Sequence, residues 1–207
     1  MRIRFFRSLA LLAFPAFMAV TQCSAAAIFS APPNLSGGTD MNGNLVADSF
    51  TLASSATITQ IQFWALQDNL ASYTGSIFWS INTNSGGLPG SAILSGTASA
   101  VAASTGSSAF GLNEFIYSFN TNGTLAAGTY WLELHNGPTN AIPGTNMFWE
   151  NSNANSGNSQ TKDLSLPAQP FVANFTSLAF ALSTPEPGSM VLMATGLLGA
   201  VLLRRRK

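Results

Sequence analysis

The chain has 207 residues and a formal net charge of zero, but seven of its eight basic residues lie in the first seven and last four positions. The stretch 28–183 therefore carries one lysine against seven acidic residues, a net charge of −6, which excludes a nucleic-acid-binding protein because phosphate neutralisation needs Lys and Arg. Cys23 is the only cysteine, so this stretch holds no disulfide, no thiolate nucleophile and no cysteine-ligated zinc.

The N-terminus has the features of a secretory signal. Three arginines stand in the first seven residues, an apolar run follows over residues 9–20, and small residues suited to cleavage occupy 25–27. We predict a helical signal peptide over residues 1–27, which does not belong to the fold. A lipoprotein signal that modifies Cys23 is the alternative, but Gln22 before it has the wrong size for that signal.

Residues 28–183, about 155 residues, suffice for one domain with a proper core. Residues 28–44 are rich in Pro, Gly and Asn and predict an irregular lead-in. Short runs of residues that favour β-structure follow, separated by turn residues. The predicted strands are 47–53, 57–66, 74–82, 92–100, 114–120, 128–136, 147–150 and 178–183.

Alternation gives several of these strands one apolar face. Ile77, Trp79 and Ile81 share a face, and Leu132 and Leu134 share another. Turns are predicted at 84–87, 88–90 and 120–123, because Asn and Gly adopt positive φ at little cost. Residues 98–108 predict a strand end or a loose loop, and the polar segment 137–170 predicts a long loop.

These elements predict an all-β fold: an antiparallel β-sandwich, jelly-roll-like, flanked by the N-terminal signal helix and a C-terminal hydrophobic helix. The predicted divisions are a signal peptide at 1–27, the sandwich at 28–183 and a C-terminal segment at 184–207.

Four residues are the candidates for ligand binding. Trp131, Glu133 and His135 share one face of the strand 128–136, and Trp149 borders the Asn- and Ser-rich stretch 151–159. Tryptophan rings stack on the C–H faces of sugars, so these residues suggest a carbohydrate-binding platform. Since Trp buries a large area, a core position for the tryptophans and a solvated strand face for Glu133 and His135 are the alternatives.

Metal binding and catalysis have weaker signals. Asp40, Asn42 and Asn44 resemble the opening of a calcium loop, with Asp48 a further oxygen donor, but Leu45 stands where that loop needs glycine. We therefore predict no metal site. A polar turn is the simpler interpretation, and a calcium site completed by other loops is the alternative.

A secreted hydrolase is a further alternative, since a glycosidase needs two carboxyl groups across a cleft. Glu114, Glu133 and Glu150 are available, but nothing in the sequence pairs them. We predict no catalytic residues, no cofactor and no enzyme.

The C-terminus combines three parts in a fixed order. Pro185, Glu186 and Pro187 precede an uncharged apolar run over 190–203, and Arg204, Arg205, Arg206 and Lys207 end the chain. A helix over that run is roughly 22 Å long, short of the ~30 Å hydrocarbon core, and snorkelling arginines make up part of the difference. The terminal charges favour leaving this end in the cytoplasm.

This arrangement resembles the PEP-CTERM sorting signal of Gram-negative bacteria, with Thr184 where that family often has valine. The resemblance implies a recognition motif at Pro185, Glu186 and Pro187, a transient inner-membrane anchor at 190–203 and a basic stop at 204–207. It implies an exosortase-type membrane protease as partner, which cuts at or near the motif.

The body is also similar to the β-sandwich bodies common in PEP-CTERM proteins, through residues 48–52, 88–90, 127–132 and 178–180. The expected function is that of an exported, non-catalytic protein of the cell surface or extracellular matrix. A carbohydrate-binding module that acts on exopolysaccharide is the first alternative, and a secreted hydrolase is the second.

Overall fold

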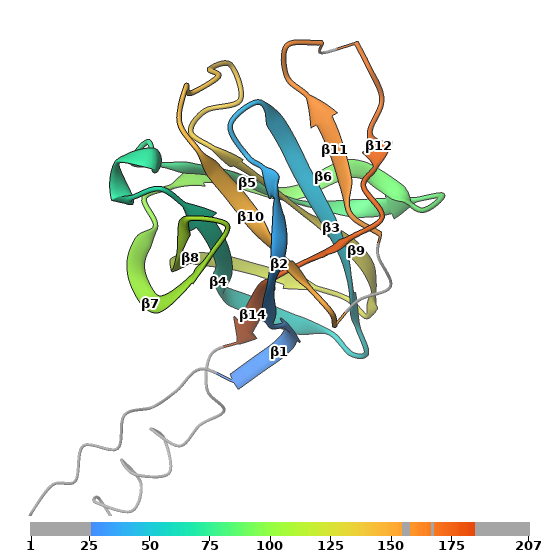
Figure 1. Cartoon of the computed structure of the whole chain (residues 1–207). Helices are drawn as coiled ribbons and strands as arrows, with labels where there is room; N and C mark the ends of the chain where they lie inside the picture. The colour runs from blue at the N-terminus through green and yellow to red at the C-terminus, as the bar shows by residue number, and fades with distance from the viewer. Residues whose placement is uncertain (1–25, 155–157, 167, 185–207) are drawn as a thin grey trace, which may run out of the picture.

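A computed structural model describes residues 26–154, 158–166 and 168–184, which fold into two antiparallel β-sheets packed face to face (Figure 1). Within these residues the helical content is one short 3-10 turn, η1 (Leu70–Ser72). The predicted all-β antiparallel sandwich is confirmed. The predicted helix over 190–203 and residues 1–25 of the predicted signal helix over 1–27 lie outside the described residues. The last two residues of that predicted helix, Ala26 and Ala27, instead belong to the strand Ala26–Ala31. No helix in the described ranges has the length and apolar character needed to cross a membrane.

The larger sheet has eight strands. Its main path runs β1 (Ala26–Ala31), β14 (Phe180–Thr184), β4 (Ala56–Gln67), β10 (Met147–Ser152) and β13 (Ser177–Leu178). Three strands branch from this path. β2 (Pro33–Asp40) pairs with β10, β8 (Leu112–Leu125) pairs with β4, and β7 (Val101–Ala109) pairs with β8.

The smaller sheet has six strands. Their order is β12 (Val172–Ala173), β11 (Gln160–Asp163), β3 (Asn44–Leu52), β9 (Gly128–Asn136), β5 (Ile77–Ser85) and β6 (Leu88–Ala98). β9 lies between β3 and β5 and pairs with both, from Val46↔Leu134 on one side to Trp79↔Leu134 on the other. Both edges of this strand are therefore covered.

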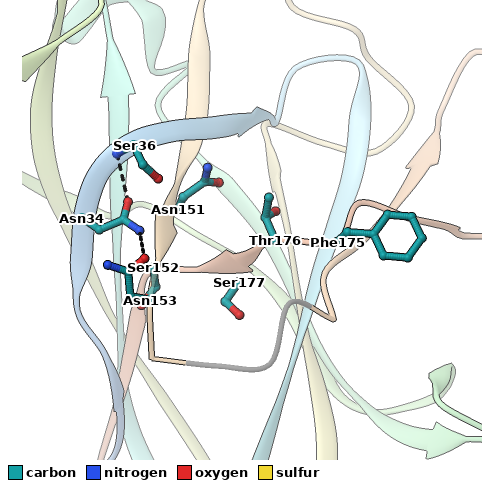
Figure 2. A pocket seen from close by; sticks show the side chains of 8 residues that line it. All are labelled: Asn34, Ser36, Asn151, Ser152, Asn153, Phe175, Thr176 and Ser177. Carbon is teal, nitrogen blue, oxygen red and sulfur yellow. Dashed lines mark hydrogen bonds between the residues drawn. The ribbon is translucent and has the colours of Figure 1, made fainter.

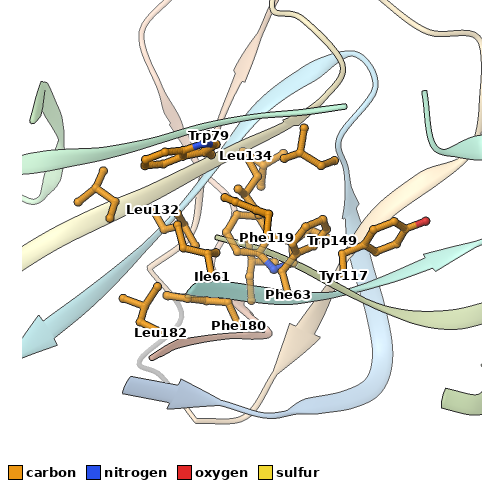
Figure 3. Packing of buried hydrophobic residues seen from close by; sticks show 14 of the residues in the cluster. Ile61, Phe63, Trp79, Tyr117, Phe119, Leu132, Leu134, Trp149, Phe180 and Leu182 are labelled. Atoms are coloured by element: carbon orange, nitrogen blue, oxygen red, sulfur yellow. The ribbon is translucent and has the colours of Figure 1, made fainter. Parts of the chain in front are cut away.

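The core fills the space between the sheets (Figure 3). The alternation in the sequence correctly predicts its members on the smaller sheet, since Ile77, Trp79, Ile81, Leu132 and Leu134 are all buried. The larger sheet contributes aromatic rings. Phe63 stacks on Tyr117 with ring centroids 5.2 Å apart, and Trp149 meets Phe180 edge-on at 5.7 Å. The core members that Figure 3 labels are Ile61, Phe63, Trp79, Tyr117, Phe119, Leu132, Leu134, Trp149, Phe180 and Leu182.

The predicted irregular lead-in over 28–44 is wrong, because β1 and β2 occupy most of it. β1 lies at an edge and pairs with β14, and β2 branches from β10. Pro33 is the first residue of β2, a position at which proline costs a sheet no ladder hydrogen bond. The Pro- and Gly-rich stretch 28–44 therefore forms strands at the edge of a sheet and not a loop.

Two of the three predicted turns are also wrong. Residues 88–90 begin β6, and the turn before them is Gly86-Gly87, with φ of 63° and 85°. Residues 120–123 lie inside β8, at a register shift opposite β4. Gly123 and the Leu94 side chain approach closely there, and a Cβ at position 123 would force that side chain to move.

The two segments for which the sequence predicted loops or left the choice open, 98–108 and 137–170, both contain strands. Residues 101–109 form β7, which pairs with β8 along one edge, so the small residues of this stretch belong to a strand. Within the polar segment 137–170, the predicted strand 147–150 is confirmed as part of β10, whereas residues 160–163 form β11, a strand that was not predicted.

Candidate functional site

The four predicted ligand-binding residues are all buried. Trp131 is 2 % exposed and Trp149 is 0 % exposed, so the surface positions expected for these two rings are wrong. The Trp131 indole N–H donates to Asn84 Oδ1 at 3.0 Å, and that of Trp149 donates to the Ala179 carbonyl at 2.8 Å. Both rings are part of the packing and hold neighbouring segments together.

Glu133 and His135 lie beside Trp131 on the outer face of β9, and the neighbouring strands close over them. Ser80 donates to Glu133 Oε2 at 2.7 Å. Burial raises the pKa of Glu133, and hydrogen bonds from Ser80 and Asn82 offset part of that rise.

The His135 ring nitrogens face the carbonyl oxygens of Asn44 and Ala141, at 3.2 and 3.1 Å. Either neutral tautomer donates to one of them. The solvated strand face considered from the sequence is therefore an internal polar layer, since His135 is 0 % exposed.

The residues that resemble a calcium loop form a polar turn. The Asp40 carboxylate accepts hydrogen bonds from the backbone N–H groups of Asn42 and Gly43 and from the side chain of Asn42. Asp48 lies further along β3, buried, and accepts from Ser49 N and Leu178 N. Among the described residues no group of three or more His, Cys, Asp or Glu is placed to hold a metal ion.

Two glutamates that sequence reasoning left unpaired come together in the structure. Glu114 of β8 and Glu150 of β10 are 4 % and 0 % exposed, and their carboxyl groups interact. Burial, chiefly, together with the Glu114 carboxyl, raises the pKa of Glu150 to about 7, against the opposing effect of a hydrogen bond from Leu35 N at 2.7 Å. Thr105 donates to Glu114. This pair is buried, and neither carboxyl lines the pocket described next.

A polar pocket of about 300 Å³ opens where β2, the end of β10 and the segment before β13 meet (Figure 2). Its wall includes Asn34 and Ser36 on one side and Phe175 and Thr176 on the other, with Asn151 between them. Asn34 Nδ2 donates to Asn153 Oδ1 at 2.7 Å, and Asn34 Oδ1 accepts from Ser36 N at 2.9 Å.

Sequence reasoning did not find this pocket because it is assembled from three segments far apart in the chain. It assigned the first to an irregular lead-in and the second to an Asn- and Ser-rich loop. The available signal was the density of Asn and Ser in residues 151–159.

The C-terminal segment begins where the sandwich ends. β14 ends at Thr184, and β14 is paired with β1 from Ala26↔Thr184 to Ala31↔Phe180. A family model described as the PEP-CTERM protein-sorting motif matches residues 183–207. The chain carries a PEP-CTERM sorting motif. No curated protein and no solved structure matches the chain.

The PEP-CTERM match contains the predicted recognition residues Pro185, Glu186 and Pro187 and the basic stop Arg204, Arg205, Arg206 and Lys207. All seven lie outside the described residues. The match overlaps the described part of the chain at Ser183 and Thr184, the last two residues of β14. The sorting motif therefore starts at the end of the folded body, with no linker between them.

Proposed function

We propose that this protein is an exported, non-catalytic component of the cell surface or extracellular matrix, delivered through its PEP-CTERM signal. The observation that carries the proposal is the match of the sorting motif to residues 183–207, directly after the last strand. The motif implies export and processing by a membrane-associated exosortase.

The pairing of β1 with β14 fits this route. Ala26 pairs with Thr184 and Ala27 with Ser183, so the two ends of the described chain leave the sandwich side by side (Figure 1). A cut at or near Pro185, Glu186 and Pro187 falls after the last paired residue of β14. Removing the tail therefore costs the body no strand residue, and the sandwich stays intact.

The proposed sequence of events follows from the parts of the signal. The apolar run 190–203 enters the inner membrane, and the four terminal basic residues keep that end in the cytoplasm. The exosortase-type protease recognises Pro185, Glu186 and Pro187 and removes the tail. The body is then released or attached outside.

The non-catalytic part of the proposal rests on where the carboxyl groups lie. Glu114, Glu133 and Glu150 are each at most 5 % exposed, and a glycosidase needs its two carboxyl groups to reach a substrate in a cleft. These glutamates serve the packing of the body instead. In the extracellular matrix, the partner we propose for the body is exopolysaccharide.

Intact mass spectrometry of the protein recovered from outside its native cells tests the proposal. We expect a mass that lacks residues 190–207 and the signal peptide. Replacing Pro185, Glu186 and Pro187 by alanine should leave full-length tails in the membrane fraction, whereas Phe110→Ala, on a distant hairpin, should be processed normally. Extracellular protein that still carries Arg204, Arg205, Arg206 and Lys207 would contradict the proposal.

A further inference from the structure

The polar pocket beside β10 has an uncharged wall. Its lining consists of asparagine amides, serine and threonine hydroxyls and one phenylalanine ring. Each amide offers donors and an acceptor, and each hydroxyl offers both, so the wall matches a neutral ligand with many hydroxyl groups. Its volume of about 300 Å³ lies at the lower end of the range of small-molecule sites. The net charge of −6 over residues 28–183 disfavours an anionic ligand.

Phe175 stands at the rim of the pocket in a conformation that costs free energy. Its φ is +52°, the residue is 83 % exposed, and its ring points away from the other side chains of the pocket (Figure 2). Hydrogen bonds on both sides fix this geometry: Asn174 N donates to Ser159 O at 2.8 Å, and Ser159 N donates to Thr176 O at 2.9 Å. A bulky residue with positive φ and an exposed ring gains no packing in return, and such outliers gather at ligand sites.

A second strained residue lies on the opposite wall. Leu35 has a φ of +57° and separates Asn34 from Ser36, both of which line the pocket. Leu35 N donates to the buried Glu150 carboxyl, which anchors this bend to β10. Two of the three non-glycine residues with positive φ in the described ranges therefore flank one pocket, and the third is Phe110 at the β7–β8 turn.

The pocket also holds an unmet acceptor. Asn151 Oδ1 is buried and has no hydrogen-bond partner, which costs free energy unless something supplies a donor. Figure 2 shows the Asn151 amide between Ser36 and Thr176, with Asn34 held to Asn153 nearby. Because Oδ1 is closed to solvent, a rotation of the Asn151 amide is what would bring it to the pocket, where a ligand hydroxyl would supply the missing donor.

We propose that this pocket binds a neutral sugar unit of a polysaccharide, with Asn34 and Asn151 contacting its hydroxyl groups and the next unit passing over the Phe175 ring. The site uses none of the tryptophans that the sequence suggested. It belongs to the folded body and does not depend on how the PEP-CTERM tail is processed.

Saturation-transfer-difference NMR tests this proposal with the full chain in a detergent that has no sugar headgroup. The probes are gluco-, manno- and N-acetylglucosamine oligosaccharides of six units, with hexagalacturonate as the anionic comparison. We expect transfer to at least one neutral oligosaccharide and none to hexagalacturonate. Phe175→Ala and Asn151→Ala should each weaken that binding roughly five- to ten-fold.

Phe110→Ala is the matched control, because Phe110 is likewise exposed, at 73 %, with a φ of +56°, but lies on the β7–β8 hairpin away from the pocket. It should bind as the unaltered chain does. Thermal unfolding of each variant shows whether the fold is retained. The proposal is overturned if no neutral oligosaccharide shows transfer, if hexagalacturonate competes, or if Phe175→Ala binds like the unaltered chain.

Discussion

Two polar regions of the sandwich differ in what closes them. The outer face of β9 carries Trp131, Glu133 and His135, and all three are buried. Side chains of the neighbouring strand β5 contact the first two, and the Ala141 carbonyl, in the segment after β9, contacts the His135 ring. The pocket beside β10 is open, and segments that contain residues with positive φ form two of its walls. Polar residues are therefore buried in the packing of one region and line an open pocket in the other.

The comparison teaches that residue chemistry alone does not place a site. Tryptophan, glutamate and histidine on one strand face suggest a binding platform, yet side chains of β5 and the segment after β9 cover that face. Asparagine and serine at the end of a strand suggest only a loop, yet β2, β10 and the segment before β13 enclose a hollow there. Substitutions in each region test whether the outer face of β9 is packed and whether the pocket walls are free of a structural role.

The largest effect should come from the sealed region. Trp131→Ala removes a ring that is 2 % exposed and its hydrogen bond to Asn84. We expect the free energy of unfolding to fall by about 3–5 kcal/mol, because a large cavity forms. Denaturant titration measures this loss. A change below about 1 kcal/mol would mean that the outer face of β9 is not packed as described.

Next comes the pH dependence of stability. Burial, with a smaller contribution from the Glu114 carboxyl, raises the pKa of Glu150 to about 7 from its ordinary value of 4.5, so between these values the folded state binds more protons than the unfolded state. Stability should therefore be highest below pH 4.5 and fall by roughly 1–3 kcal/mol as the pH rises to 7, with little change above. The raised pKa of Glu133 adds a contribution of the same sign.

Thermal unfolding of the unaltered chain between pH 4.5 and 8 measures this dependence. Glu150→Gln should flatten most of it, since glutamine keeps the shape without titrating, and Glu133→Gln should remove a separate part. A melting temperature that rises from pH 4.5 to 7 would contradict the assignment.

A smaller effect is expected at the wall of the open pocket. Asn34→Ala removes the hydrogen bonds to Ser36 N and Asn153 Oδ1, both at solvent-exposed positions. The free energy of unfolding should fall by about 1 kcal/mol. Asn34→Asp keeps the acceptor for Ser36 N and loses the donor to Asn153, so denaturant titration should show about half that loss.

The smallest effect belongs to Phe175. Phe175→Gly relieves the strain of a φ of +52°, so the free energy of unfolding should stay the same or rise by up to about 1 kcal/mol. Phe175→Ala keeps a Cβ in that conformation and should bring no gain. A loss of more than 1 kcal/mol in Phe175→Gly would show that the ring supports the fold and would weaken the contrast between the two regions.

Much of the fold could be predicted from the sequence. The alternation of Ile77, Trp79 and Ile81 fixed a core face, and β9 has the bounds predicted for it. The edge strands β1 and β2 were missed, because an edge strand tolerates the Pro and Gly that a central strand rejects. The pocket was missed because Asn34, Asn151 and Phe175 come together only through sheet pairing.

The sequence by itself determined the sorting signal, because a recognition motif, an apolar run and a basic stop act through their linear order. It also determined which strand faces are apolar, because side chains alternate along an extended backbone. Only the tertiary structure decided which polar residues reach solvent. That outcome depends on which segments cover each face of a strand, and these segments, such as β5 and the stretch around Ala141 beside β9, are brought there by the fold.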